Sequence, residues 1–365
     1  MPAKDWLRPP RHLLVMFLAI TLTLAAALGW LGWRLLEQDR ALEAQRVLER
    51  QEVAADLVVT ALQRGLTEVE ERLTGLAGRS GGDLSAQAQE YGGTLPPDAV
   101  LVLFEATGVE ACPRSRLLYY PFVAPAQEPA SDLFAAADAF EFKRQDYAAA
   151  IAGLGKLARA ADPLTRAAAL ARLGRNYRKS GRWQEARWAY EALRQLGVTP
   201  VSGLPAELVA REALCELLEA RKEEAELRRQ AAALWADLGS GRWALSRAAY
   251  TFYSSQARRR AGTSLLEAAR QGAEALAEGA EALWEEWQRV RHGEGVASGG
   301  RSQRFGDRPI LLVWRSTPEG MAALAAGAGY VESRWMRGLE PALANHNARV
   351  ALVDSDGRPV WGSLE

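Results

Sequence analysis

The stretch LARLGRNYRKSGRWQEARWAYEAL, residues Leu170–Leu193, decides how most of this chain folds. Leucine, alanine and tyrosine recur in it at intervals of three and four residues, which is the period of a helix with one apolar face. The sequence Ser-Gly-Arg at 180–182 interrupts this period and indicates a tight turn. The stretch therefore predicts two antiparallel helices that pack against each other.

The spacing of small and apolar residues in this stretch resembles the tetratricopeptide repeat. Gly174 and Ala186 are small where two antiparallel helices approach closely, while Tyr177 and Tyr190 are expected to fill the space between neighbouring hairpins. The residues that match the pattern, and that we expect to pack the repeat, are Leu170, Leu173, Gly174, Tyr177, Gly181, Ala186 and Tyr190.

Residues 131–291 repeat this organisation. One repeat length upstream, Asp146–Ala150 match the start of the second helix, although Asp138 stands where the repeat has glycine. Downstream, 205–221 and 223–238 predict a third hairpin, and a long Ala- and Glu-rich helix follows it. About three hairpins predict a short α-solenoid with one concave face.

A cationic groove is the candidate binding site. The first helix of each tetratricopeptide hairpin lines the groove, which here predicts the residues Ala168, Ala171, Arg175, Arg178 and Lys179. Residues 161–200 hold eight basic and three acidic side chains, and 241–262 hold five Arg and no acid. Since Arg binds carboxylate or phosphate through two hydrogen bonds, we expect an anionic ligand or an acidic peptide as partner. In the alternative interpretation these cations pair with acids of the next hairpin, namely Glu207, Glu212, Glu216 and the glutamates of 223–226.

The N-terminus predicts a single membrane span. Residues 13–33 carry no charge, and a helix of that length crosses about 30 Å of hydrocarbon. Residues 1–12 hold Lys4, Arg8 and Arg11, so the positive-inside rule places them in the cytoplasm and the bulk of the chain outside. This organisation predicts a single-pass membrane protein with an extracytoplasmic body; the resemblance described below adds that the membrane is the bacterial inner membrane and the body periplasmic. The alternative is a cleaved signal peptide, because Ala25–Ala27 supply small residues.

A helical stalk follows the span. Residues 35–78 contain no proline and predict one long helix. Its apolar residues alternate at intervals of four and three, which is the a/d pattern of a two-stranded coiled coil. The stripe consists of Ala55, Val59, Leu62, Leu66, Val69, Leu73 and Leu76. It predicts either a parallel homodimer or a helix that packs this stripe on its own chain.

The segments that flank the repeats look different. Residues 79–130 predict a linker with short strands at 100–104 and 117–122, and residues 292–307 predict a second linker. Residues 308–365 predict a small α+β unit of sensory, PAS- or Cache-like type, with a strand at 309–314, a helix at 329–347 and a hairpin at 350–361.

One metal-like spacing in that hairpin is expected to be a turn. Asp354, Asp356 and Glu365 stand at EF-hand positions 1, 3 and 12. The glycine of the loop is Gly357, at position 4 instead of 6, and position 5 offers no ligand. A hairpin turn therefore explains the sequence better than a calcium loop.

The sequence offers little for catalysis. It contains no phosphate-binding glycine loop, no HExxH and no nucleophile elbow, and two Cys and three His are too few for a typical zinc site. We expect Cys215 in a core, Cys112 in a loop where it could be exposed, and His346 as a helix cap. No catalytic residue, metal or cofactor is predicted. Equal numbers of basic and acidic residues, 45 each, argue against a nucleic-acid partner.

Four stretches together resemble the extracytoplasmic input half of a group of bacterial membrane sensor histidine kinases. They are LLYYPFVAPAQEPASDLFAAADAFEF at 117–142, RLGRNYRKSG at 172–181, VTPVSGLPAELVAREALCELL at 198–218 and GRWALSRAAYTFY at 241–253. The resemblance implies an anchor, a stalk, repeats and a small α/β piece, followed in such proteins by a second span and a kinase core. The phospho-accepting His and the ATP lid of that core are absent from this chain, so no kinase activity is expected of it.

The expected function is therefore that of a membrane-anchored, extracytoplasmic sensing module of a two-component system. Ligand or partner binding on the repeats or on the α/β piece would shift the stalk between two arrangements. The alternatives are a standalone periplasmic scaffold for protein–protein interaction and, least favoured, an enzyme.

Overall fold

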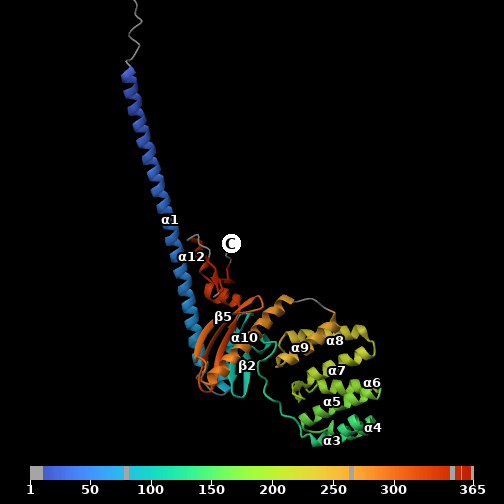
Figure 1. Ribbon diagram of the computed structural model, residues 1–365. Helices are drawn as coiled ribbons and strands as arrows, with labels where there is room; N and C mark the ends of the chain where they lie inside the picture. Colours follow the sequence, from blue (N-terminus) through green and yellow to red (C-terminus); the bar gives the residue numbers. More distant parts are fainter. Residues whose placement is uncertain (1–10, 78–81, 263–266, 346–349, 355, 363–365) are drawn as a thin grey trace, which may run out of the picture. The chain divides into compact units, whose positions relative to one another are not determined.

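The computed structural model describes residues 11–77, 82–262, 267–345, 350–354 and 356–362. The chain is mainly helical, with a small antiparallel sheet (Figure 1), so the expectation of a mainly helical protein with a long apolar N-terminal helix is confirmed. It divides into two units. The first holds residues 1–63, 336–352 and 362–365, and the second holds residues 64–335 and 353–361.

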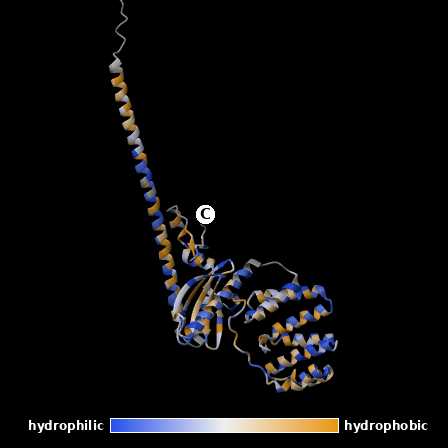
Figure 2. Cartoon of the chain, viewed as in Figure 1, coloured by the Kyte–Doolittle hydropathy of each residue, from blue (hydrophilic) through white to orange (hydrophobic). Residues whose placement is uncertain are grey.

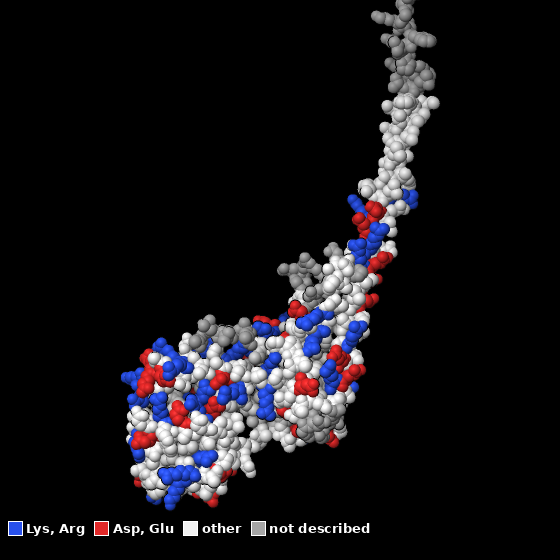
Figure 3. Space-filling view, turned by 180° about the vertical axis from the view of Figure 1, so that it is seen from behind, with Lys and Arg blue, Asp and Glu red and all other residues white. Residues whose placement is uncertain are grey.

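The N-terminal helix α1 (Arg11–Ala77) is continuous over 67 residues. Its section from Val15 is long and apolar enough to cross a membrane, and its large apolar side chains are exposed. Figure 2 shows this section as predominantly hydrophobic, and Figure 3 shows no charge on it until the charged section that follows. Arg34 lies over the ring of Trp30, 5.2 Å from its centre, at the end of the apolar section.

The main sheet joins segments from both ends of the second unit. Its strand order is β2-β1-β7-β6-β5, and all neighbouring strands are antiparallel. The strands are β1 (Ala99–Glu105), β2 (Gly108–Cys112), β5 (Ser298–Phe305), β6 (Arg308–Ser316) and β7 (Gly320–Ala326). β1 pairs with β7 along its whole length, from Ala99 opposite Ala326 to Glu105 opposite Gly320.

This pairing differs from the sequence prediction at both flanks of the repeats. The segment 79–130 was expected to be a linker with short strands. The strand expected at 100–104 is present as β1, but it lies inside the main sheet between β2 and β7, and the segment also contains β2 and helix α2 (Gly82–Thr94). The segment 292–307, also expected to be a linker, contributes edge strand β5. Residues 117–122 form no strand beyond a single bridge between Tyr120 and Ser246. A run of apolar residues identifies a buried strand but not its partner, because the pairing is long-range.

The two faces of the sheet bury different partners. Val102, Leu312 and Ala325 belong to a core that also contains residues of α8, α9 and α10. Leu101, Val313 and Leu324 lie on the other face, in a core with the end of α1 and with α2. Because side chains alternate along each strand, residues next to each other in β6 and β7 serve opposite cores.

The repeats lie between β2 and β5 in the chain. Consecutive helices from α3 to α9 pack against each other in a stack, whereas α10 packs on the main sheet (Figure 1). They are α3 (Asp132–Asp138) with the π-helix η2 (Ala139–Arg144), α4 (Tyr147–Leu157), α5 (Pro163–Lys179), α6 (Trp183–Arg194), α7 (Ala206–Ala220), α8 (Glu224–Gly239), α9 (Arg247–Ala261) and α10 (Glu267–Arg291). A short ribbon, β3 (Pro200–Val201) and β4 (Leu204–Pro205), precedes α7.

The residues predicted to pack the repeat meet at the α5–α6 contact. Gly174 lies directly against the ring of Tyr190 and leaves no room for a Cβ atom. Ala186, Leu170 and Leu173 are buried, and Tyr177 is half-buried between two core clusters. The sequence Ser-Gly-Arg at 180–182 forms the turn between the helices, with the backbone of Gly181 at a positive φ of 72°.

The C-terminal segment is less regular than predicted. In place of one helix over 329–347 there are α11 (Ala328–Tyr330), the π-helix η3 (Val331–Met336) and α12 (Glu340–Asn345). Gly338, whose φ of 92° lies outside the helical region, interrupts the helix. The predicted hairpin is present as β8 (Leu352–Val353) and β9 (Pro359–Trp361). Asp354 accepts backbone hydrogen bonds from Asp356 and Arg358 in its turn, while Glu365 lies outside the described residues.

The predicted stalk stripe is divided between two environments. Val69, Leu73 and Leu76 are buried against the sheet of their own chain, whereas Ala55 and Val59 are exposed. The C-terminal half of the stripe therefore stabilises the second unit by packing on its own chain.

Replacing Leu73 with Ala should lower the free energy of unfolding by about 2 to 5 kcal/mol, because its fully buried side chain leaves a cavity between α1 and the sheet. Urea unfolding of the detergent-solubilised chain measures this. Val59→Ala, at an exposed position of the same helix, should change stability by less than about 0.5 kcal/mol. A loss for Leu73→Ala that depends on protein concentration would contradict packing within one chain.

Candidate functional site

A buried carboxylate organises the first two hairpins. Glu141 of η2 is only 2% exposed, and both of its oxygens accept hydrogen bonds from α5. Arg175 donates to these oxygens through Nε at 2.6 Å and Nη2 at 2.7 Å, and Lys179 donates at 2.8 Å. Asn176 adds a third donor at 2.9 Å. One carboxylate therefore engages two of the cations that the sequence placed in an open groove.

Local backbone structure directs Glu141 toward α5. The π-helical turn η2 ends at Gln145, which adopts a left-handed conformation with φ of 55°. Asp146 then caps α4 by accepting a hydrogen bond from the backbone N–H of Ala149. Asp138, where the repeat pattern has glycine, accepts from Arg172 of α5 at 3.1 Å. The departure from the repeat pattern thus supplies an ion pair between hairpins.

The environment of Glu141 keeps its carboxyl group ionised. Burial alone would raise its pKa, but hydrogen bonds from Arg175, Lys179 and Asn176, together with the guanidinium charge, outweigh burial and lower the pKa to about 2. Charge-assisted hydrogen bonds of this kind are stronger than neutral ones. The carboxyl group of Glu141 is therefore ionised at neutral pH.

Similar pairs continue from α5 to α9. Arg178 of α5 pairs with Glu216 of α7. Arg260 of α9 donates to Glu212 at 2.6 Å and to Glu219 at 2.9 Å, both on α7. We call the whole series the ion-pair ladder; it consists of Asp138, Glu141, Arg172, Arg175, Arg178, Lys179, Glu212, Glu216, Glu219 and Arg260. It connects the first helices of four successive hairpins.

The ladder changes the interpretation of the predicted groove. Arg175, Arg178 and Lys179 all have carboxylate partners, Ala168 is buried, and Ala171 is half-buried against the α6–α7 core. The alternative of pairing with the next hairpin describes Arg178, whose partner Glu216 was among the acids considered. An open cationic groove at these residues is therefore replaced by a packing role. Figure 3 shows the same intermixing of both charge signs over the helical hairpins.

Glu141 is the central residue that sequence reasoning missed. Asp138 and Glu141 precede Arg172 and Arg175 by 34 residues each, which is the length of a tetratricopeptide repeat. Opposite charges at one repeat length could therefore have indicated the contact.

A larger opening lies between α8, α9 and α10. We call it the α9 cleft; its volume is about 610 Å³. Its lining contains the aromatic residues Trp235 and Tyr250, the hydroxyl residues Thr251, Ser254 and Ser255, the arginines Arg258, Arg259 and Arg270, and one acid, Glu274. Two of these arginines belong to the basic segment 241–262 that the sequence singled out.

Arg270 is held in a fixed position in the α9 cleft. Its guanidinium lies over the ring of Trp235, 4.1 Å from the ring centre, and Nε donates to the hydroxyl of Tyr250 at 3.0 Å. Burial raises the pKa of that phenol, so it is neutral at physiological pH. Arg258 and Arg259 extend from the last turn of α9, and Arg259 hydrogen-bonds the neutral side chain of Gln256. The cleft therefore contains guanidinium groups at a partly apolar wall.

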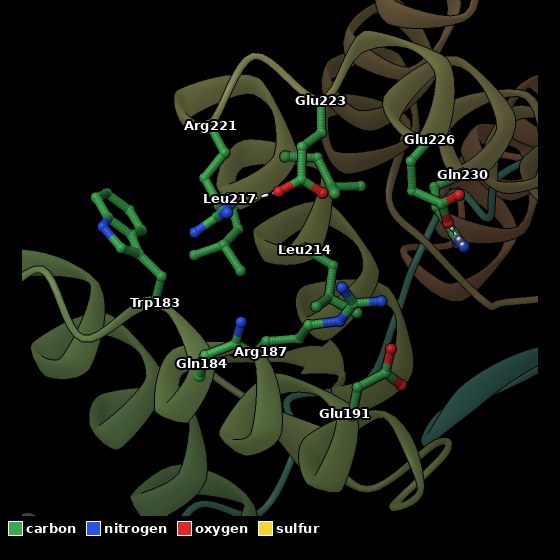
Figure 4. A pocket seen from close by; sticks show the side chains of 11 residues that line it. Trp183, Gln184, Arg187, Glu191, Leu214, Leu217, Arg221, Glu223, Glu226 and Gln230 are labelled. Atoms are coloured by element: carbon green, nitrogen blue, oxygen red, sulfur yellow. Dashed lines mark hydrogen bonds and ion pairs between the residues drawn. The ribbon is translucent and has the colours of Figure 1, made fainter.

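A second opening, between α6, α7 and α8, is much smaller. Its volume is about 50 Å³, and its lining mixes Arg187 and Arg221 with Glu191, Glu223 and Glu226. Figure 4 shows the arginines and glutamates of this crevice interleaved around Leu214 and Leu217, with Arg221 linked to Glu223. A space of that size holds water-sized molecules, so we do not assign a ligand to it.

The cysteines do not form a reactive site. Cys112 ends β2 and is buried, in contrast to the expected exposed loop, and Cys215 lies in the core between α7, α8 and α9. Both are free thiols, and burial raises the pKa of Cys112 to about 12 and that of Cys215 to about 11. Among the described residues no group of three His, Cys, Asp or Glu could hold a metal ion. His346 lies outside the described residues.

No family model, curated protein or solved structure matches this chain. A function for the α9 cleft must therefore be argued from the residues that line it and from their geometry.

Replacing Glu141 with Gln should lower the free energy of unfolding by about 2 kcal/mol at neutral pH, because Arg175 and Lys179 lose their shared carboxylate while remaining partly buried. Chemical denaturation measures the change. The matched control is Glu224→Gln, which breaks an exposed pair with Arg228 and should cost less than about 0.5 kcal/mol. Equal effects of the two variants would contradict the role of Glu141.

The contribution of Glu141 should also depend on pH with a defined sign. Its pKa is lowered from 4.5 to about 2 by folding, so its stabilisation is fully present above pH 4.5 and is lost as the pH falls toward 2. The difference in unfolding free energy between wild type and Glu141→Gln should therefore shrink over this range. A difference that stays constant down to pH 2 would disprove the assignment.

Proposed function

We propose that this chain is a membrane-anchored, extracytoplasmic sensing module, the signal-input portion of a two-component sensor histidine kinase, and that it binds its ligand in the α9 cleft. The observation that carries this proposal is the double role of α10. Arg270 and Glu274 near its start line the cleft, and the following turns cover one face of the main sheet. A single helix thus connects the α9 cleft with the main sheet.

Close packing makes α10 suited to transmit a change. A Cβ atom at Gly279 would lie 3.2 Å from the side chain of Leu312 and 3.3 Å from that of Ile310, so the helix lies tightly on β6. Leu283 and Trp287 are fully buried in the same core. A helix packed in this way moves together with the strands beneath it.

The opposite face of the same strands contacts α1. Val313 and Leu324 pack in one core with Val69 and Leu73 of α1, which also carries the predicted membrane-spanning segment. A ligand that favours one position of α10 could therefore bias the packing of α1 through β6 and β7. Such a shift requires that the ligand bind one arrangement more tightly than the other.

The order of the main sheet supports a sensory domain. Numbered in chain order, its five strands run 2-1-5-4-3 and all neighbours are antiparallel, and we propose by fold-level analogy that this sheet is the predicted sensory domain. On this view the repeats are inserted between the second and third strands. We interpret residues 131–291 as tetratricopeptide-like, since a close Gly174–Tyr190 contact and a 34-residue offset of paired charges fit that repeat.

A standalone periplasmic scaffold is the second candidate function. It is favoured by large exposed aromatic side chains on the repeats, Trp188 of α6 and Phe252 of α9, which suit a protein partner. A parallel homodimer would have to use the part of α1 before Leu66, since the rest of the stripe packs on its own sheet. The coding sequence beyond codon 365 discriminates the candidates, because the receptor requires a second span and a kinase core there.

The proposed topology can be tested by cysteine labelling in intact bacteria. Val198→Cys places a thiol at a position that is 78% exposed, whereas Cys112 and Cys215 are buried and should give little background. A membrane-impermeant maleimide should label this variant in intact cells. Ala3→Cys, on the predicted cytoplasmic side, should be labelled only after permeabilisation. The reverse pattern would contradict an extracytoplasmic body.

A further inference from the structure

We infer that the α9 cleft binds a small organic anion, a phosphate or carboxylate compound with an apolar body, through Arg259 and Arg270. This inference rests on the proposed function, because it names the ligand class of the same cleft. The shared chemistry of the two anion types is an oxyanion that accepts several hydrogen bonds from guanidinium groups.

The contrast with the ion-pair ladder carries the inference. Every arginine of the ladder meets a carboxylate on a neighbouring helix. In the cleft, Arg259 hydrogen-bonds Gln256, and Arg270 hydrogen-bonds the Tyr250 hydroxyl and the Trp235 carbonyl, all of which are neutral. Against Arg259 and Arg270 the described lining holds a single carboxylate, Glu274. The α9 cleft is therefore cationic, whereas the arginines of the ion-pair ladder are neutralised by carboxylates.

The remaining lining suits the non-charged parts of such a ligand. Thr251, Ser254 and Ser255 offer hydroxyl groups beside the arginines, and the half-buried ring of Trp235 offers an apolar wall. A volume of about 610 Å³ is within the range of small-molecule sites, which is about 300 to 1,000 Å³. Arg270 is already oriented by Trp235 and Tyr250, so less side-chain entropy is lost when it binds an anion.

Arg270 also has a structural alternative. Its guanidinium lies at the C-terminal turn of α8, where a cation interacts favourably with the helix dipole. Its replacement could therefore weaken the fold as well as the site. Arg259 is exposed, donates only to a side chain one turn away in its own helix, and is the better residue for a binding test.

The test is calorimetric titration of the full chain in detergent with four probes that share a benzene ring: phenyl phosphate, phenylacetate, benzyl alcohol and benzylamine. We expect one or both anions to bind, and binding to weaken as salt is added. Arg259→Gln should weaken anion binding by about tenfold, the loss of one charge-assisted hydrogen-bonding group. Arg259→Lys should retain part of the affinity.

The matched control is Arg229→Gln on α8, which removes an equally exposed arginine that pairs with Glu226 outside the cleft. It should leave anion affinity unchanged. Equal losses in Arg259→Gln and Arg229→Gln, or equal binding of benzylamine and the anions, would overturn the anion assignment while leaving the cleft as a ligand site. Absence of binding by all four probes at about 10 mM would overturn both the anion assignment and the proposed binding in this cleft.

Discussion

The pairing of β1 with β7 is the contact on which the second unit depends. It joins residues 99–105 to residues 320–326, so the repeats, which lie between β2 and β5 in the chain, must leave the sheet and return to it. The returning element is α10, which covers one face, while α1 and α2 cover the other. Without this pairing the repeats would be a separate module. With it they are an insertion whose last helix is part of the core of the sheet.

The ion-pair ladder shows how charge is used in the repeats. A basic first helix could present its cations to a ligand or to neighbouring hairpins, and the two uses compete for the same side chains. Arg175 and Lys179 already bind the buried carboxylate of Glu141, which also accepts a hydrogen bond from Asn176. These two cations therefore have little capacity to bind another anion. Ligand-binding capacity is consequently expected where the ladder ends, at the turn of α9 that contains Arg259, which donates to the neutral side chain of Gln256.

Local patterns in the sequence were sufficient to predict the helices of the repeats and the apolar part of α1, but not to predict the strand pairing of the sheet. The period of Leu170–Leu193 predicts α5 and α6, and the uncharged run predicts the apolar part of α1. Val100–Phe104 is recognisable as a buried strand, yet its partner lies beyond the repeats, and apolar alternation contains no information on register across such a distance. The α9 cleft could not be predicted from the sequence for the same reason. Trp235, Tyr250 and Arg270 come from three different helices and lie close together only because these helices pack.

Tight packing limits how a ligand in the α9 cleft could act. The backbone of Gly279 lies so close to β6 that a Cβ atom there would press on Leu312 and Ile310, so a shift of α10 along the sheet would have to displace these side chains. A movement of α10 would therefore carry β6 and β7 with it, and Leu73 on the opposite face would have to repack. Interfaces of this kind favour a few discrete arrangements over gradual deformation. The sheet is thus better suited to switch α1 between two packings than to bend it by degrees.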